Sequence, residues 1–240
     1  MVNSPFAAYD WARAECEGLE TVLGAASVVL RCSGALHFPR TRTLVVADLH
    51  FEKGSAFARR GQLLPPFDTR ATLDRLEAEL AQSDPATLVF LGDSFHDGFG
   101  ESRLHPHDFA RLAALASGRE LVWIVGNHDK EGPRVLPGAV LAEMTVEGVA
   151  LRHEPEADAT VEVVGHLHPA ARVAAYGRSV RRRCFVTDGS RMVLPAFGAF
   201  TGGLNVLNAA FHGLFARPPL IGALGREKVH AIGWRSLLPD

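Results

Sequence analysis

The sequence predicts an α/β protein, a layered sandwich of two mixed β-sheets flanked by helices. Short apolar runs rich in Val and Leu end at glycine or polar residues, as buried strands do. In the first half of the chain these runs alternate with helical patterns, which is typical of a parallel sheet built from βαβ units. After residue 139, short strands follow one another without clear helices between them. This change predicts a second, mixed or antiparallel sheet that faces the first.

The elements of the first half follow from periodicity and turn residues. A glycine turn at Gly34 predicts a hairpin between residues 28–32 and 35–38. Residues 51–67 are expected to form a loop. A helix is expected from an N-cap at Asp68 to about residue 81, because leucines recur there at i, i+3 and i+7. The other expected elements are strands at 44–47, 88–91 and 121–125 and a helix near 106–117.

The second half is expected to consist of short strands. They fall at about 140–146, 149–153, 161–164, 172–175, 183–187 and 191–194.

We expect one domain over residues 27–240, preceded by a loosely packed, Ala- and Glu-rich leader at residues 1–26. A length of 240 residues suffices for a sizeable core, and 47% hydrophobic with 22% charged residues is typical of globular proteins. The net charge of −2 excludes a global basic field, so a polyanion must be held by a local patch or by bound cations. No signal peptide and no apolar run near the roughly 18 residues of a membrane span are visible, so we expect a cytoplasmic location without membrane contact.

The three cysteines give no sign of a shared site. Cys16, Cys32 and Cys184 are odd in number, lie far apart and form no C-x-x-C pair. They are expected to be free thiols in a reducing compartment, which excludes a disulfide framework and a zinc ribbon.

Five of the predicted strands end in residues of the types that bind metal ions. In open α/β sheets, ligands bind beyond the carboxyl ends of the strands, so these five ends point at one shared site. Alternate residues of a strand lie on the same side, which lets both members of a D-x-H or H-x-H pair reach one cluster. The candidate metal ligands are Asp48, His50, Asp93, Asn127, His153, His166 and His168.

This donor set contains carboxylate, imidazole and amide groups but no thiolate. It is typical of sites for ions such as Mn²⁺, Fe²⁺ or Zn²⁺ and not of a structural zinc site built from cysteines. The ligands are too many for one ion, but they fit two ions if one carboxylate bridges. Two divalent ions about 3.5–4 Å apart are the usual clamp for displacement at phosphorus, with a bridging hydroxide as the nucleophile.

The motifs D-x-H, G-D, G-N-H-D, a lone His and G-H-x-H, in that order, resemble the calcineurin-like metallophosphoesterase superfamily. The resemblance implies two ion sites that share Asp93. The first would consist of Asp48, His50, Asp93 and His168, and the second of Asp93, Asn127, His153 and His166. It also implies that His128 is not a ligand but stabilises or protonates the leaving oxygen, and that Asp129 orients His128.

A narrower resemblance, over residues 28–235, is to the ligase-associated DNA-damage-response phosphoesterases, the PdeM family. It rests on residues 47–54, 61–68 and 194–204. It implies a Mn²⁺-dependent phosphodiesterase or endonuclease acting on DNA, expected to be single-stranded, in a repair context and in association with an ATP-dependent DNA ligase and a helicase. Glu52 departs from the family pattern, which has a smaller residue there. An extra carboxylate beside the metal site is expected to alter the preference for metal or substrate.

Substrate contacts are expected from three residues near the metal motifs. His96 comes three residues after Asp93, and Lys53 and Arg59 follow the first motif. A purely structural role is an equally open reading for each of them.

Two further groups have a favoured structural interpretation. The only dense basic cluster is expected to be a solvated edge strand rather than a patch for the DNA backbone. Its members are Arg178, Arg181, Arg182 and Arg183. Phe197 and Phe200 are expected to pack in the core rather than to stack on bases.

Two alternative functions stay open at this point. The chain is equally compatible in fold with a small-nucleotide or phosphomonoester hydrolase. It would also suit a metal-stabilised subunit that recruits a ligase or a helicase. The pair His128 and Asp129 argues against the second alternative, because a purely structural metal site does not need it.

Overall fold

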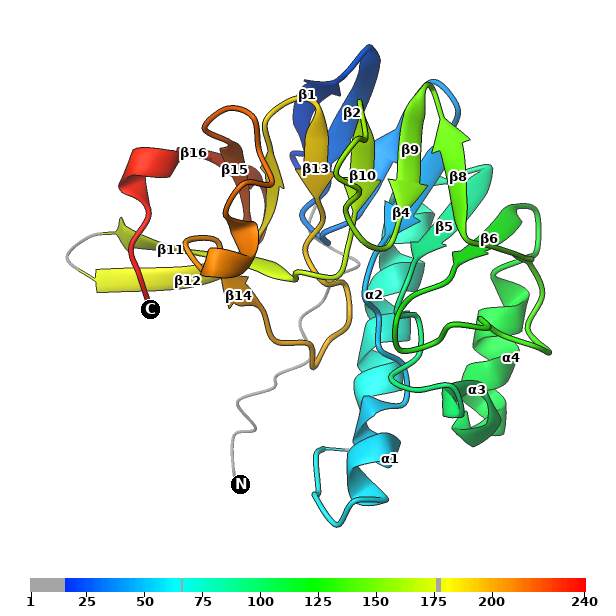
Figure 1. Ribbon diagram of the computed structural model, residues 1–240. Coiled ribbons are helices and arrows are strands. Elements are labelled where there is room, and N and C mark those ends of the chain that lie inside the picture. Colours follow the sequence, from blue (N-terminus) through cyan, green and yellow to red (C-terminus); the bar gives the residue numbers. More distant parts are fainter. Residues whose placement is uncertain (1–15, 66, 176–177) are drawn as a thin grey trace.

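The computed structural model describes residues 16–240 except residues 66 and 176–177, and it contains two β-sheets packed face to face (Figure 1). The first sheet has its strands in sequence order, with helices on its outer face. The second sheet lies against the inner face. The predicted α/β sandwich of two mixed sheets is confirmed.

The first sheet is antiparallel at one side and parallel at the other. Its first four strands are antiparallel neighbours, whereas the fourth to the seventh are parallel. The strands are β1 (Leu19–Leu23), β2 (Ala26–Leu30), β3 (Leu36–Phe38), β4 (Thr43–Val46), β5 (Thr87–Leu91), β6 (Glu120–Ile124) and β7 (Ala139–Leu141). The predicted hairpin is the β2–β3 pair, and Gly34 in its turn has a φ of 93°.

The second sheet mixes a parallel centre of β9, β10 and β13 with antiparallel neighbours. A pair of strands, β15 and β16, joins it through β12. The strands are β8 (Glu143–Val146), β9 (Val149–Arg152), β10 (Glu162–Val164), β11 (Pro169–Ala175), β12 (Arg178–Thr187), β13 (Arg191–Val193), β14 (Leu204–Asn205), β15 (Leu220–Leu224) and β16 (Val229–Gly233). In Figure 1, β11 and β12 extend from this sheet as a long hairpin.

The helices are few, and the longer ones cover the first sheet. α2 and α4 pack on its outer face, where the rings of Phe90 and Trp123 stack with centroids 3.9 Å apart. The described helices are α1 (Lys53–Ala58), α2 (Asp68–Ser83), α3 (Gly100–Arg103) and α4 (Pro106–Ala114), with 3₁₀ turns η1 (Ala209–Phe211) and η2 (Trp234–Ser236). Within the described part of the chain, no helix has the length and apolarity needed to cross a membrane.

Side-chain alternation in the parallel strands separates two cores. In β4, Val45 belongs to the core between the sheets, whereas Leu44 and Val46 pack toward the helices. The same holds in β5 for Val89 and Phe90. Because both faces of these strands are covered, they are apolar throughout, and this is why their sequence signal is strong.

The expected leader is wrong in its second part. Residues Leu19–Leu23 form β1, which pairs with β2 in register from Leu19↔Leu30 to Leu23↔Ala26. The sequence pattern concealed this strand because only one of its faces is covered. Residues 1–15 lie outside the described residues, and the single domain over residues 27–240 stays a prediction.

The expected loop at residues 51–67 and the expected cap at Asp68 also need correction. A short helix, α1, lies inside the loop. α2 begins at Asp68 itself, and the residue before it, Phe67, makes no side-chain cap. The Asp68 carboxylate instead accepts a hydrogen bond from the backbone N–H of Gly54, at 3.0 Å, and so ties α1 to the start of α2.

The expectation of three free thiols is wrong for two of them. Cys16 and Cys32 form a disulfide, with Cα atoms 5.8 Å apart, while Cys184 is free and buried. The cause is the β1–β2 hairpin, because continuing its register past Leu19↔Leu30 brings the residues before β1 beside those after β2. Spacing in the sequence carried no sign of this pairing.

Candidate metal centre

The structure brings the seven predicted ligands to one place, where the ends of both sheets meet. β4, β5 and β6 are parallel neighbours, so their carboxyl ends lie along one edge of the first sheet. β9 and β10 are parallel neighbours in the second sheet. A direct bond joins the two groups, because the backbone N–H of His166 donates to both carboxylate oxygens of Asp48, at 3.1 and 3.0 Å.

One donor set consists of Asp48, His50 and His168. The Nε2 atoms of His50 and His168 are 3.3 Å apart. Asp48 Oδ1 lies 3.3 Å from His168 Nε2. Asp48 and His50 are buried, whereas His168 is partly exposed, so this set opens to solvent on the side of the second sheet.

A second donor set consists of Asn127, His153 and His166. Asn127 Oδ1 is 3.0 Å from His153 Nε2 and 3.0 Å from His166 Nδ1, and the two nitrogens are 3.3 Å apart. The three donor atoms thus form a nearly equilateral triangle.

Asp93 faces both sets with the same oxygen atom. Its Oδ2 lies 3.4 Å from His153 Nε2 and 3.8 Å from His50 Nε2. Its other oxygen, Oδ1, accepts a hydrogen bond from the backbone N–H of His128, at 2.9 Å. One oxygen of the carboxylate is therefore fixed by backbone, and the other is directed between the two sets.

The spacing of these donors fits divalent ions. An ion with donors at about 2.0–2.2 Å holds neighbouring octahedral donors about 3 Å apart. The separations of 3.0 and 3.3 Å in the two sets match this spacing. Two imidazole nitrogens that face each other cannot both accept without a proton or a cation between them. The chemistry of the donor set and its geometry both fit a pair of ions.

The charges of the site follow from burial and from the carboxylates. Burial and the neighbouring His168 lower the pKa of His50 to about 2, which keeps the ring in the neutral, ion-binding form. Burial opposes ionisation of Asp93, but the hydrogen bond and charge of His153 outweigh it and lower the pKa of Asp93 to about 2. Burial likewise opposes a charge on His153, but Asp93 and Asp48 outweigh it and raise the pKa of His153 to about 9. A proton on His153 thus takes the place of a cation, and a bound ion would displace it.

Left-handed backbone is concentrated at this site. Such a conformation costs a non-glycine residue about 1–2 kcal/mol and persists only where its surroundings enforce it. Five of the seven predicted ligands adopt it, with φ of 53° at Asp48, 48° at His50, 46° at Asp93, 66° at His166 and 46° at His168. The chain bends sharply after each strand so that the side chains turn back into the site.

Glycines before the ligands allow this close approach. A Cβ atom at Gly126 would lie 2.2 Å from Asp93 Oδ1, and one at Gly92 would lie 2.1 Å from His153 Nδ1. Neither contact is sterically allowed. The glycines of the G-D and G-N-H-D motifs are thus needed for packing one ligand loop against the next.

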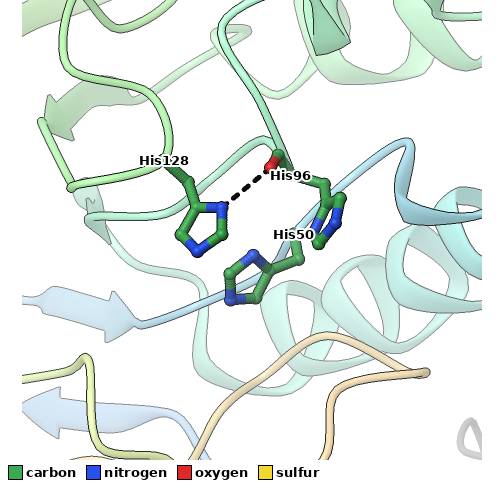
Figure 2. Close-up of side chains that lie close together, drawn as sticks. All are labelled: His50, His96 and His128. Atoms are coloured by element: carbon green, nitrogen blue, oxygen red, sulfur yellow. Dashed lines mark hydrogen bonds between the residues drawn. The ribbon is translucent and has the colours of Figure 1, made fainter. Parts of the chain in front are cut away.

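His128 lies beside the two donor sets, and a ring nitrogen of it forms a separate group with donor nitrogens of His50 and His96, all within 4.8 Å of one another. Figure 2 shows its ring near those of His50 and His96, with centroid distances of 5.1 and 5.4 Å. Its Nδ1 donates to the backbone carbonyl of His96 at 2.9 Å, which leaves Nε2 to face the site. Nε2 is 3.9 Å from Asp93 Oδ2, and the side chain is 40% exposed, so a substrate can reach it.

Asp129 does not orient His128 as expected. Its carboxylate accepts backbone hydrogen bonds from Phe95 at 3.1 Å and from Gly126 at 3.0 Å, and His128 uses the His96 carbonyl instead. The reason is geometric, since the sharp bend after β6 turns Asp129 into the protein and His128 outward. Asp129 therefore ties together the two loops that carry Asp93 and Asn127.

The three predicted substrate contacts lie at different depths. His96 borders the site, and burial, with the charge of Lys53 second, lowers its pKa to about 4. Lys53 begins α1, and its Nζ lies 5.9 Å from the centroid of the Phe57 ring, which in turn contacts the ring of His96. Arg59 is the C-cap of α1 and is exposed. Glu52 is directed to α2, where Thr69 Oγ1 donates to its carboxylate at 2.9 Å.

The basic cluster divides into exposed and partly buried members. Arg178 and Arg182 are exposed on β12, as expected for a solvated strand. Arg183 is instead partly buried and donates to the carbonyls of Ala196, Ala199 and Thr201, at 2.9, 3.3 and 2.7 Å. Arg183 thus holds the loop at residues 196–201 in place. In this loop the backbone N–H of Phe197 donates to the carbonyl of Ala47, which precedes Asp48 of the first metal motif.

The two phenylalanines of this loop are both covered, but to different degrees. Phe197 is fully buried and lies under the guanidinium of Arg75, with 4.2 Å from the guanidinium carbon to the ring centroid. Core packing is thus confirmed for Phe197, which has no face open to a base. Phe200 is partly buried.

Comparison with known proteins agrees with this geometry. A family model described as calcineurin-like phosphoesterase matches residues 41–158. A solved structure, the nuclease MPE of Pseudomonas putida, is 30% identical to this chain with a TM-score of 0.69, and the match covers 90% of this chain and all of that one (100%). The chain belongs to the calcineurin-like phosphoesterase family.

Two other solved structures are less similar to this chain. A protein of unknown function from Aquifex aeolicus is 17% identical with a TM-score of 0.37, covering 52% of this chain and 78% of that one. The phosphoesterase Yfce of E. coli is 15% identical with a TM-score of 0.40, covering 80% of this chain and 98% of that one. A search of curated proteins gives no match.

The phosphoesterase is a metal-dependent hydrolase, and its family match contains the first four metal motifs, from Asp48 to His153.

Sequence reasoning missed one residue that the structure adds to the site. The carboxylate of Glu154 lies within 4.8 Å of donor nitrogens of His153 and His166. Alternation in a strand predicts that Glu154 points away from His153, but β9 has already ended at Arg152.

Proposed function

We propose that this phosphoesterase is a two-metal-ion phosphodiesterase that cleaves DNA. The observation that supports it most directly is the position of Asp93 Oδ2, which faces His153 of one donor set at 3.4 Å and His50 of the other at 3.8 Å. A carboxylate oxygen so placed is suited to bridge two ions. The ions would be held by Asp48, His50, Asp93 and His168 and by Asp93, Asn127, His153 and His166.

When bound, such ions supply an activated water near neutral pH and positive charge opposite the phosphate. The residues of the chain then have separate roles. His128 turns Nε2 toward the leaving oxygen, because its Nδ1–H donates to the His96 carbonyl. In the imidazolium form both ring nitrogens carry a proton, and Nε2–H can then be given to the leaving oxygen. Asp129 keeps the loops of both donor sets in register through its two backbone bonds.

A nucleic-acid substrate is supported by the neighbour described as a nuclease and by the resemblance to the DNA-damage-response phosphoesterases. Lys53 and Arg59 on α1 would contact the DNA backbone near the site, and His96 would border the scissile phosphate. From the same resemblance we propose Mn²⁺ as the native ion, single-stranded DNA as the substrate, and a repair role with a DNA ligase and a helicase. A cytoplasmic location stays a prediction.

The test compares four substrates on the full chain with MnCl₂: single-stranded DNA, duplex DNA, bis-p-nitrophenyl phosphate and p-nitrophenyl phosphate. We expect cleavage of single-stranded DNA and of the diester, and loss of both after treatment with a chelator. Asp93→Asn should abolish cleavage, whereas His212→Ala, a change at an exposed histidine, serves as the matched control. Hydrolysis of the monoester alone would refute the nuclease function and favour a phosphomonoester hydrolase.

A further inference from the structure

A cleft of about 510 Å³ borders the second donor set on its open side. Asn127 and His153 of that set line it, together with Lys130 and Arg152. Its lining also includes three glutamates, namely Glu143, Glu154 and Glu156. Three carboxylates beside a centre that would bind negatively charged phosphate require an explanation.

Two of the three glutamates are accounted for by Arg152. Glu143 pairs with its guanidinium at 2.8 Å, and Glu156 forms an ion pair with it as well. Glu154 is different, because among the described residues it has neither an ion-pair partner nor a side-chain hydrogen bond. An exposed carboxylate without a partner is common in itself. A role for Glu154 must therefore be argued from its position.

That position is at the metal centre. A carboxylate oxygen of Glu154, His153 Nε2 or Nδ1 and a ring nitrogen of His166 all lie within 4.8 Å of one another. Donors at about 2.0–2.2 Å from one ion can be at most about 4.4 Å apart. Because the three atoms lie within 4.8 Å of one another, the Glu154 oxygen is close to the separation at which it would share one ion with the histidines. The side chain has freedom to adjust, since Glu154 is exposed and follows the end of β9.

We propose that Glu154 is a further carboxylate ligand of the ion held by Asn127, His153 and His166. The inference rests on the proposed two-ion function. Two divalent ions carry +4, and Asp48 and Asp93 offset −2 of it. A third carboxylate lowers the remaining charge to +1.

The added carboxylate also changes the balance of oxygen and nitrogen donors in the second set. Without Glu154, this ion has one amide and two imidazoles besides the shared carboxylate. An additional carboxylate oxygen makes the set harder and favours Mn²⁺ over ions that prefer nitrogen donors. Glu154 thus acts on the affinity and the choice of ion rather than on the phosphate.

The experiment is a calorimetric titration of the metal-free full chain with MnCl₂ and, separately, with ZnCl₂. It compares the wild type with Glu154→Gln and with Glu156→Gln as the matched control on the same cleft wall. We expect Glu154→Gln to weaken one of two Mn²⁺ sites about tenfold or more, to leave the other unchanged, and to affect Zn²⁺ less. Glu156→Gln should stay within about twofold of the wild type, and Glu154→Asp should recover part of the loss.

The outcomes separate this proposal from the proposed function. If the wild type binds two Mn²⁺ and Glu154→Gln binds both with unchanged affinity, the ligand role of Glu154 is refuted and the two-ion centre stands. If the wild type binds fewer than two Mn²⁺, the two-ion function itself fails. Equal losses in Glu154→Gln and Glu156→Gln would show a general charge effect and also refute a ligand role. Circular dichroism of each metal-free variant checks that folding is unchanged.

Discussion

Replacement of His128 by alanine should separate ion binding from protonation of the leaving group. Nothing in the donor sets depends on the imidazole, since Nε2 is 3.9 Å from Asp93 Oδ2 and therefore makes no hydrogen bond to it. The bond that His128 does make to Asp93 comes from its backbone N–H, at 2.9 Å, and alanine keeps it. We expect His128→Ala to bind Mn²⁺ with wild-type stoichiometry and nearly wild-type affinity.

The loss of activity should depend on the leaving group. A positioned general acid contributes roughly 10²–10⁴-fold, or about 2.7–5.5 kcal/mol of transition-state stabilisation. The deoxyribose oxygen that leaves in DNA cleavage is a poor leaving group and needs the proton. The p-nitrophenolate ion is stable without one. We therefore expect a fall of about 10²–10⁴-fold in turnover of DNA and a fall of less than about tenfold for bis-p-nitrophenyl phosphate.

The assay measures kcat for both substrates under saturating Mn²⁺, with His212→Ala as the control for an exposed histidine. Metal content is determined on the same samples. Equal falls for the two substrates would refute general-acid catalysis by His128 and favour charge stabilisation of the phosphate. Loss of Mn²⁺ from His128→Ala would contradict the geometry from which the prediction starts.

Three other perturbations test the architecture of the site. Gly126→Ala places a Cβ 2.2 Å from Asp93 Oδ1, and we expect calorimetry to show Mn²⁺ affinity reduced by about tenfold or more. Gly98→Ala has no atom within 4 Å of the added Cβ and should behave as the wild type. Reduction of the Cys16–Cys32 disulfide, which closes a loop with a sequence separation of 16, should lower the free energy of unfolding by about 3 kcal/mol in urea titrations. Mn²⁺ at about 100 times its Kd should raise the free energy of unfolding by about 2.7 kcal/mol per site over the chelator-treated protein, and equal thermal midpoints would contradict ion binding to the folded chain.

Three of the predicted ligands could be placed from the sequence because each follows closely after a strand that is buried along most of its length. Asp48, Asp93 and Asn127 follow three parallel neighbours, and the apolar runs of those strands are unbroken. Once the strands are placed, sheet geometry determines that their ends meet. The same argument extends to His153 and His166, which follow β9 and β10.

The features that sequence reasoning missed depend on contacts between distant segments. The disulfide between Cys16 and Cys32 needs the register of the β1–β2 hairpin, and β1 itself has one uncovered face that weakens its pattern. Asp129 meets Phe95, 34 residues earlier, because two loops cross at the strand ends. Glu154 lies near His153 and His166 because β9 ends at Arg152, one residue before the end of the expected strand at 149–153. None of these contacts has a local signal.

The G-N-H-D loop after β6 shows how the distance between the two donor sets is determined. Gly126 allows contact with the Asp93 loop, Asn127 places its Oδ1 in the second set, and the backbone N–H of His128 donates to Asp93 Oδ1. Asp129 then bonds both loops through their backbone N–H groups. A displacement of this loop would therefore move Asn127 and Asp93 together. The separation of the proposed ions is for this reason a property of backbone contacts between two loops, and substitutions that leave every ligand side chain in place can still abolish ion binding.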